Sequence, residues 1–131
     1  MKYDLGNKTV VITGANSGIG KAASMQLAQL GANVVMMCRN KERGEQALQD
    51  VRAVATTGSV ELILVDMSSQ TSVRKAITEF LSGHSQLDAL IHNAANYDLA
   101  QKKPIMTSDG IESIFATNHV NISLMTKLLL D

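Results

Sequence analysis

The stretch Thr13-Gly14-Ala15-Asn16-Ser17-Gly18-Ile19-Gly20 decides the fold of this chain. It follows the apolar run Val10-Val11-Ile12 and opens into a helical pattern. Glycines let a backbone approach a phosphate, and a helix N-terminus offers free N–H groups and a positive dipole end, so this order predicts a phosphate-binding βα turn. The spacing G-x-x-x-G-x-G differs from the usual dinucleotide fingerprint G-x-G-x-x-G. An ordinary βα turn, with glycines that only permit close packing, remains an alternative at this point.

Length and composition are typical of one globular α/β domain. The chain has 131 residues, of which 45% are hydrophobic. Twelve basic and twelve acidic residues give a formal charge of zero, so neither a nucleic acid nor an anionic membrane is an expected partner. The single cysteine, Cys38, excludes an internal disulfide and suits a reducing compartment. No apolar leader segment or membrane-length apolar run is present in the sequence, and we expect a cytoplasmic location.

Short apolar runs alternate with amphipathic stretches along the chain. Residues 8–13, 33–38, 60–65 and 89–94 are predicted strands, and apolar residues at helical spacing predict a helix after each of the first three. Continuous apolar strands separated by helices indicate a parallel sheet covered on both faces. Right-handed crossovers then give half of a doubly wound sheet with strand order 3-2-1-4.

The last third of the chain carries a loop and a helix. About a dozen residues after Ala95 form a loop that contains Pro104, and Asp109 followed three positions later by Glu112 resembles a capping box. We therefore expect the last helix to begin there and to run to the C-terminus. No linker or low-complexity tract interrupts the pattern, so residues 1–131 are expected to form one domain.

Several motifs together resemble the N-terminal half of the short-chain dehydrogenases/reductases. TGANSGIG is similar to the TGxxxGxG turn of that family, VDMSS to its adenine-contacting segment, HNAA to its NNAG motif, and Asn118 to its catalytic asparagine. The stretch TSDGIESIFATNHV is similar to the branch that contains retinol dehydrogenases and related NADP-dependent carbonyl reductases. The resemblance covers all 131 residues. It implies the truncated N-terminal part of a Rossmann-type NAD(P)-binding domain, from an oxidoreductase that acts on an alcohol/carbonyl pair.

The sequence departs from the family pattern at several positions. His92 and Ala95 replace the first asparagine and the glycine of NNAG, and Asn121, Ile122 and Ser123 stand where the branch has glycine, histidine and phenylalanine. The family's catalytic serine and Y-x-x-x-K motif would lie beyond Asp131. We therefore expect a fragment that is inactive alone. A non-catalytic NADP(H)-binding or regulatory module and a non-functional remnant remain alternatives.

The resemblance also implies a role for particular residues. Expected cofactor contacts are Gly14, Ser17, Gly18, Ile19 and Gly20 at the phosphates, Arg39 at a 2′-phosphate, Asp66 and Met67 at adenine, and Asn93 and Ala94 near the nicotinamide ribose. Asn118 is the one expected catalytic residue. The alternatives are a solvated Arg39, an Asp66 that caps the next helix, and an Asn93 that satisfies loop backbone groups.

Three further expectations concern the ligand and the assembly. Cys38 rather than an acidic residue ends the second strand, and the Arg39 fork suits a phosphate, so NADP(H) is expected more than NAD(H). The three histidines lack metal-ligand spacing, and no metal is expected. We also expect a homo-oligomer, because the fourth strand would be an open sheet edge and residues 128–130 an exposed leucine run.

Overall fold

Four parallel strands form one sheet in the order β3-β2-β1-β4, which confirms the predicted topology. The computed structural model describes residues 3–131. The strands are β1 (Thr9–Thr13), β2 (Asn33–Cys38), β3 (Val60–Leu64) and β4 (Ala89–Ile91). The helices are α1 (Gly18–Gln29), α2 (Lys41–Val54), α3 (Gln70–Gly83), α4 (Ser113–Phe115), the π-helical turn η1 (Ala116–Val120) and α5 (Asn121–Leu130). Among these residues, no helix has the length and apolar character needed to cross a bilayer.

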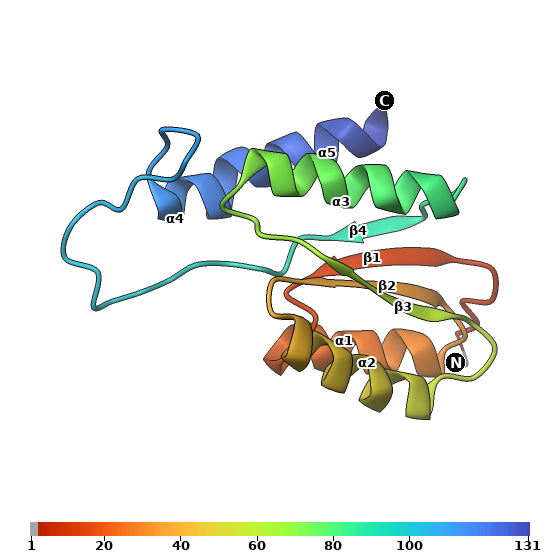
Figure 1. The fold of residues 1–131 in the computed structure, drawn as a ribbon. Helices are drawn as coiled ribbons and strands as arrows, with labels where there is room; N and C mark the ends of the chain where they lie inside the picture. Colours follow the sequence, from red (N-terminus) through yellow and green to blue (C-terminus); the bar gives the residue numbers. More distant parts are fainter. Residues whose placement is uncertain (1–2) are drawn as a thin grey trace.

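Helices cover both faces of the sheet and so create two hydrophobic cores. Helices α1 and α2 lie on one face, and α3 and α5 lie on the other (Figure 1). Successive residues of a strand point to opposite faces, so Ile12 joins the first core with Met36 and Val51, whereas Val11 joins the second core with Phe80 and Met125. All five residues of β1 are buried, as expected for a central strand.

Strand β4 is shorter than the predicted run of residues 89–94. It ends at Ile91 because the next backbone amides bind a side chain instead of a neighbouring strand. The buried Thr13 hydroxyl accepts hydrogen bonds from the amides of Asn93 at 3.1 Å and Ala94 at 3.0 Å. At the other end, the Asp88 carboxylate accepts from the Thr9 amide at 2.8 Å and from Lys8 Nζ at 3.0 Å. Side chains therefore fix both ends of the β1–β4 pairing.

The predicted capping box of the last helix is wrong, because neither Asp109 nor Glu112 has its expected role. Glu112 is the N-cap, and its carboxylate accepts from the amides of Ile114 and Phe115 at 3.0 and 2.9 Å. These bonds lower the Glu112 pKa. Asp109 instead accepts from the Gln70 amide at 2.9 Å, at the start of α3. The loop thus supplies a hydrogen-bond acceptor for the first residue of α3, which lies 39 residues earlier in the chain.

The leucine run at the C-terminus is less exposed than predicted. Leu130 is 80% exposed, but Leu128 and Leu129 are half-buried and pack against the second core. The packing of α5 along α3, visible in Figure 1, accounts for this difference.

Candidate functional site

A cleft of about 760 Å³ opens at the carboxyl ends of the strands. The turn after β1, the loops after β2, β3 and β4, and the segment around η1 contribute its walls. Ligands of open α/β sheets bind at this edge, where the strand order reverses between β1 and β4. The structure places nine of the expected cofactor contacts around this one cleft: Gly14, Ser17, Gly18, Ile19, Arg39, Asp66, Met67, Asn93 and Ala94.

The three turn glycines differ in what they do. Gly20 does not line the cleft and is buried, because a Cβ there would lie 2.2 Å from the Gly14 carbonyl oxygen and 2.5 Å from Asn93 Nδ2. Gly14 has a φ of +64°, and a Cβ would meet Ala94 Cα at 2.9 Å. Gly18 has a φ of +52° but no described atom within 4 Å of such a Cβ. Close packing therefore explains Gly14 and Gly20, whereas Gly18 faces open space.

The start of α1 leaves its first turn available to a ligand. Ser17 is the N-cap, yet its side chain makes no capping hydrogen bond within the described structure. Ser17, Gly18 and Ile19 all line the cleft, and Ile19 is 82% exposed. An uncapped first turn keeps free N–H groups and the positive end of the helix dipole at this position. These features suit an anionic group.

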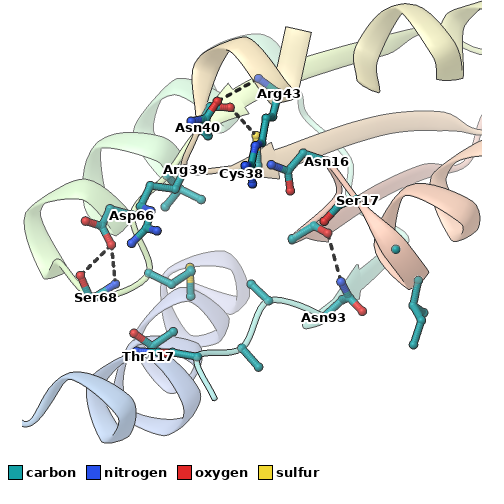
Figure 2. A pocket seen from close by; sticks show the side chains of 18 of the residues that line it. Asn16, Ser17, Cys38, Arg39, Asn40, Arg43, Asp66, Ser68, Asn93 and Thr117 are labelled. Carbon is teal, nitrogen blue, oxygen red and sulfur yellow. Dashed lines mark hydrogen bonds between the residues drawn. The ribbon is translucent and has the colours of Figure 1, made fainter. Parts of the chain in front are cut away.

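Two arginines also line the cleft. Arg39 follows β2, and Arg43 lies in the first turn of α2, where the Asn40 side chain accepts from the Arg43 amide at 2.9 Å (Figure 2). Both side chains are exposed, and no ion pair within residues 3–131 uses either of them. Sequence reasoning missed Arg43. Asn40, a favoured N-cap residue that places Arg43 in the first turn of α2, was the available signal.

The neighbouring thiol adds no charge to this region. Cys38 is buried at the end of β2, and its Sγ donates to the Asn40 carbonyl oxygen at 3.4 Å. Burial raises the Cys38 pKa, so the neutral thiol is favoured. The end of β2 therefore has no negative charge that would repel a phosphate beside Arg39.

The loop after β3 forms the wall that carries Asp66 and Met67. Asp66 Oδ1 accepts from both the amide and the hydroxyl of Ser68, at 2.9 and 2.7 Å (Figure 2). The alternative role of Asp66 as a helix cap is wrong, because Ser69 is the N-cap of α3 and accepts from the Ser72 amide. Met67 is only 6% exposed and packs in the second core. This loop thus joins the cleft to the core beneath it.

Asn93 and Asn118 both satisfy backbone groups. Asn93 Nδ2 donates to the Gly14 carbonyl oxygen at 3.2 Å, as the alternative interpretation expected, and the residue also lines the cleft. Asn118 lies in η1, where its Oδ1 accepts from the Asn96 amide and its Nδ2 donates to the Asn96 carbonyl oxygen, both at 2.7 Å. Asn118 does not line the cleft, whereas Ser113 and Thr117 of the same segment do. Its catalytic role stays a prediction.

Comparison with known proteins assigns the family. The sequence model of the short chain dehydrogenase family matches residues 8–131. This chain belongs to the short chain dehydrogenase family. Human dehydrogenase/reductase SDR family member 13 is 41% identical over 127 residues, or 97% of this chain and 32% of that protein. Human retinol dehydrogenase 13 is 35% identical, with 99% of this chain and 38% of that protein covered. The family resemblance seen in the sequence, including its retinol dehydrogenase-like relatives, is confirmed.

Solved structures show the same Rossmann-type fold. A protein from Mycobacterium paratuberculosis has a TM-score of 0.77 at 35% identity, with 98% of this chain and 43% of that chain covered. The Pseudomonas aeruginosa RhlG/NADP complex has a TM-score of 0.82 at 23% identity, with 98% and 49% covered. This short chain dehydrogenase spans about a third of the length of the curated relatives that it matches.

Proposed function

We propose that this chain is the NADP(H)-binding part of an oxidoreductase that acts on an alcohol/carbonyl pair. One observation carries the proposal. A single cleft joins an uncapped helix start behind a glycine turn to two arginines that form no ion pair among residues 3–131. A dinucleotide with a pyrophosphate and a 2′-phosphate needs both of these anion sites. Family membership supports the reaction class.

The residues present fit such a cofactor. Gly14 has no room for a Cβ, so this turn position requires glycine. Gly18 leaves open space beside Ser17 and Ile19, so the backbone there is accessible to the phosphates. Arg39 and Arg43 would hold the 2′-phosphate. Asp66 and Met67 would contact the adenine, and Asn93 and Ala94 the nicotinamide ribose. When bound, the nicotinamide supplies or accepts the hydride, and this chain's residues bind and orient it.

A preference for NADP(H) over NAD(H) follows from charge. A charge-assisted hydrogen bond to a phosphate contributes about 1.5–3 kcal/mol, which corresponds to a preference of about 10- to 100-fold. The neutral Cys38 thiol at the end of β2 leaves this attraction unopposed. Calorimetry with NADPH and NADH measures the preference directly.

Arg39→Ala should abolish most of the preference for NADPH. Arg74→Ala is the matched control, because Arg74 lies on an exposed part of α3 and outside the cleft. Equal affinities for NADPH and NADH in the unmutated chain would refute the cofactor assignment. Equal losses in the two variants would show that only net charge matters.

Binding without catalysis is the second candidate function for the chain alone. Hydride transfer needs a group that exchanges a proton with the substrate oxygen, and general acid–base catalysis contributes about 10²–10⁴-fold. No Y-x-x-x-K motif occurs in the sequence, and both ends of the Asn118 amide bind the Asn96 backbone. We expect no turnover of aldehydes or ketones with NADPH. Turnover that Gly18→Val abolishes would show that the catalytic groups lie elsewhere in this chain.

A further inference from the structure

Helix α5 contacts the loop after β3 through one buried side chain. Asn121, the first residue of α5, is 0% exposed, and its Nδ2 donates to the Met67 carbonyl oxygen at 2.8 Å. We propose that Asn121 is a positioning residue that holds the Asp66–Met67 wall of the cleft in place for the adenine side of the ligand. This inference rests on the proposed function, and it goes beyond it by assigning a role to a residue outside the cleft.

Among residues 3–131, the nitrogen of the Asn121 side-chain amide is hydrogen-bonded, whereas its oxygen is not. Its Oδ1 is buried and has no hydrogen-bond partner within the described structure. The opposite amide orientation would place this oxygen against the Met67 carbonyl oxygen, and two acceptors cannot bond to each other. A buried acceptor without a donor is unfavourable, and an apolar residue would avoid that penalty. The contact with Met67 is therefore the favourable interaction that this amide makes.

The Met67 side chain packs in the second core, and the Val65 amide donates to the Cys38 carbonyl oxygen at 2.9 Å. The other hydrogen bonds of the loop are short-range. The Asp66 amide donates to the Ser72 hydroxyl at 2.8 Å, and the Ser69 amide donates to the Asp66 carbonyl oxygen at 3.1 Å. These bonds join the loop to the start of α3. The contact with Asn121 spans 54 residues and fixes the Met67 backbone to the start of α5.

A second contact from the same part of the chain is weaker. Asp109 accepts from the Gln70 amide, but this bond is exposed, so water can replace it. Water has no access to the buried Asn121 bond. Without the Asn121 donor, the Met67 carbonyl would be left unpaired in an apolar core, and we expect the loop to move until the carbonyl finds another partner.

Asn121→Ala tests the proposal, with Thr126→Val as the matched control. Thr126 lies on the same helix, where its hydroxyl binds His92 Nε2 at 2.8 Å and donates to the Ile122 carbonyl oxygen at 2.9 Å. Its replacement by valine therefore removes other hydrogen bonds of α5 with little change in volume. We expect hydrogen exchange at the Asp66, Ser68 and Ser69 amides to be about tenfold faster in Asn121→Ala. The β1 amides should not change, and Thr126→Val should leave all of these amides at their original rates.

The ligand readout is the affinity for 2′,5′-ADP, which carries the adenine and the 2′-phosphate without the nicotinamide. Asn121→Ala should weaken it by about 5- to 10-fold, the effect of one hydrogen bond, whereas Thr126→Val should weaken it less than about twofold. If Asn121→Ala does not fold, Asn121→Ser keeps a smaller polar group and gives the same comparison.

The two proposals fail in different ways. An unmutated chain that binds neither NADPH nor 2′,5′-ADP overturns the proposed function. An unmutated chain that binds them, with an Asn121→Ala variant that binds equally well or a loop that exchanges no faster, overturns the positioning role. Faster exchange throughout β1 as well would also overturn it, because the effect would then be a general loss of stability.

Discussion

The two hydrophobic cores of this sheet differ in how much of the chain builds them. Every buried residue of the first core falls between Val10 and Val60, so the first three strands with α1 and α2 complete it. The buried residues of the second core run from Val11 to Met125 and include residues of β1, α3 and α5. The buried part of the first core is therefore local in sequence, whereas the second core is completed by Met125 when the C-terminal helix packs against α3.

The candidate cleft depends on both parts of the molecule. The glycine turn and Arg39 follow β1 and β2, whose residues line both cores, while Met67 packs in the second core and is bound by α5. Loss of the second core should therefore weaken ligand binding even where the glycine turn remains folded. The following predictions test this comparison.

The largest effect on stability is expected from a substitution that leaves a cavity in the second core. Met125 is fully buried, and Met125→Ala should lower the free energy of unfolding by about 2–5 kcal/mol. Amides of α3 and α5 should then exchange faster than those of β1 and β2. Met36→Ala is the matched variant in the first core, and it should speed exchange throughout the sheet. Identical exchange patterns in the two variants would contradict the idea that the two cores are built from different parts of the chain.

A smaller loss of stability is expected at Gly20, where α1 packs against the glycine turn and Asn93. A side chain at Gly20 would collide with the Gly14 carbonyl oxygen and with Asn93, so Gly20→Ala should lower the free energy of unfolding by about 1–3 kcal/mol. Nucleotide affinity should fall with it. Gly18→Asn is the control for stability, because asparagine tolerates positive φ and this position is open. Thermal denaturation compares the two variants, and equal losses of stability would count against the packing argument. Calorimetry measures the nucleotide affinity of Gly20→Ala.

Self-association is expected to involve the side of the second core. Among residues 3–131, strand β4 pairs only with β1, and Leu130 is 80% exposed at the end of α5. Leu130→Lys should weaken self-association about fivefold, through loss of roughly 1 kcal/mol of partial apolar burial. Leu64→Lys on β3, the opposite edge strand, should have little effect. Light scattering over a concentration series tests this, and a stable monomer throughout would refute it.

The smallest effect is the pH dependence of the stability that Asp88 contributes at the start of the β1–β4 pairing. Bonds from the Thr9 amide, Lys8 and Gln86 lower the Asp88 pKa. A carboxyl with a lowered pKa in the fold stabilises it above the unfolded pKa of about 3.9, and this contribution is lost as the pH falls through the folded pKa. The unmutated chain should thus exceed Asp88→Asn in stability near neutral pH, and the difference should shrink below about pH 4. Urea denaturation between pH 3 and pH 7 measures it, and a constant difference would contradict this origin.

The sequence predicted the strands and their order, because continuous apolar runs and helical spacing carry that information directly. It did not predict where β4 ends, since the Thr13 hydroxyl that binds the Asn93 and Ala94 amides belongs to a strand about 80 residues away. The capping error has the same cause. Asp109 and Glu112 fit a local motif, but Asp109 binds the Gln70 amide at the start of α3.

The candidate site was predictable where a residue lies in or directly after a strand or turn. Arg39, Asp66 and Asn93 all follow strands, and the structure places them around one cleft. Arg43 was missed because its position depends on where α2 begins. Thr117 was missed because it reaches the cleft from a π-helical turn, which no spacing rule had indicated. The roles of these residues toward a cofactor stay predictions.

The place of β1 has a consequence for the chain while it is being synthesised. This central strand is made first, yet its partner on one side, β4, is made about 80 residues later. At translation rates of about 5–20 residues per second, one edge of β1 stays unpaired for roughly 4–16 s. During that time the Thr9 amide has no Asp88 to bind, and the Thr13 hydroxyl has no Ala94 amide. The strand that is fully buried in the finished sheet is thus an open edge on the ribosome, where a chaperone or a second nascent chain can bind it.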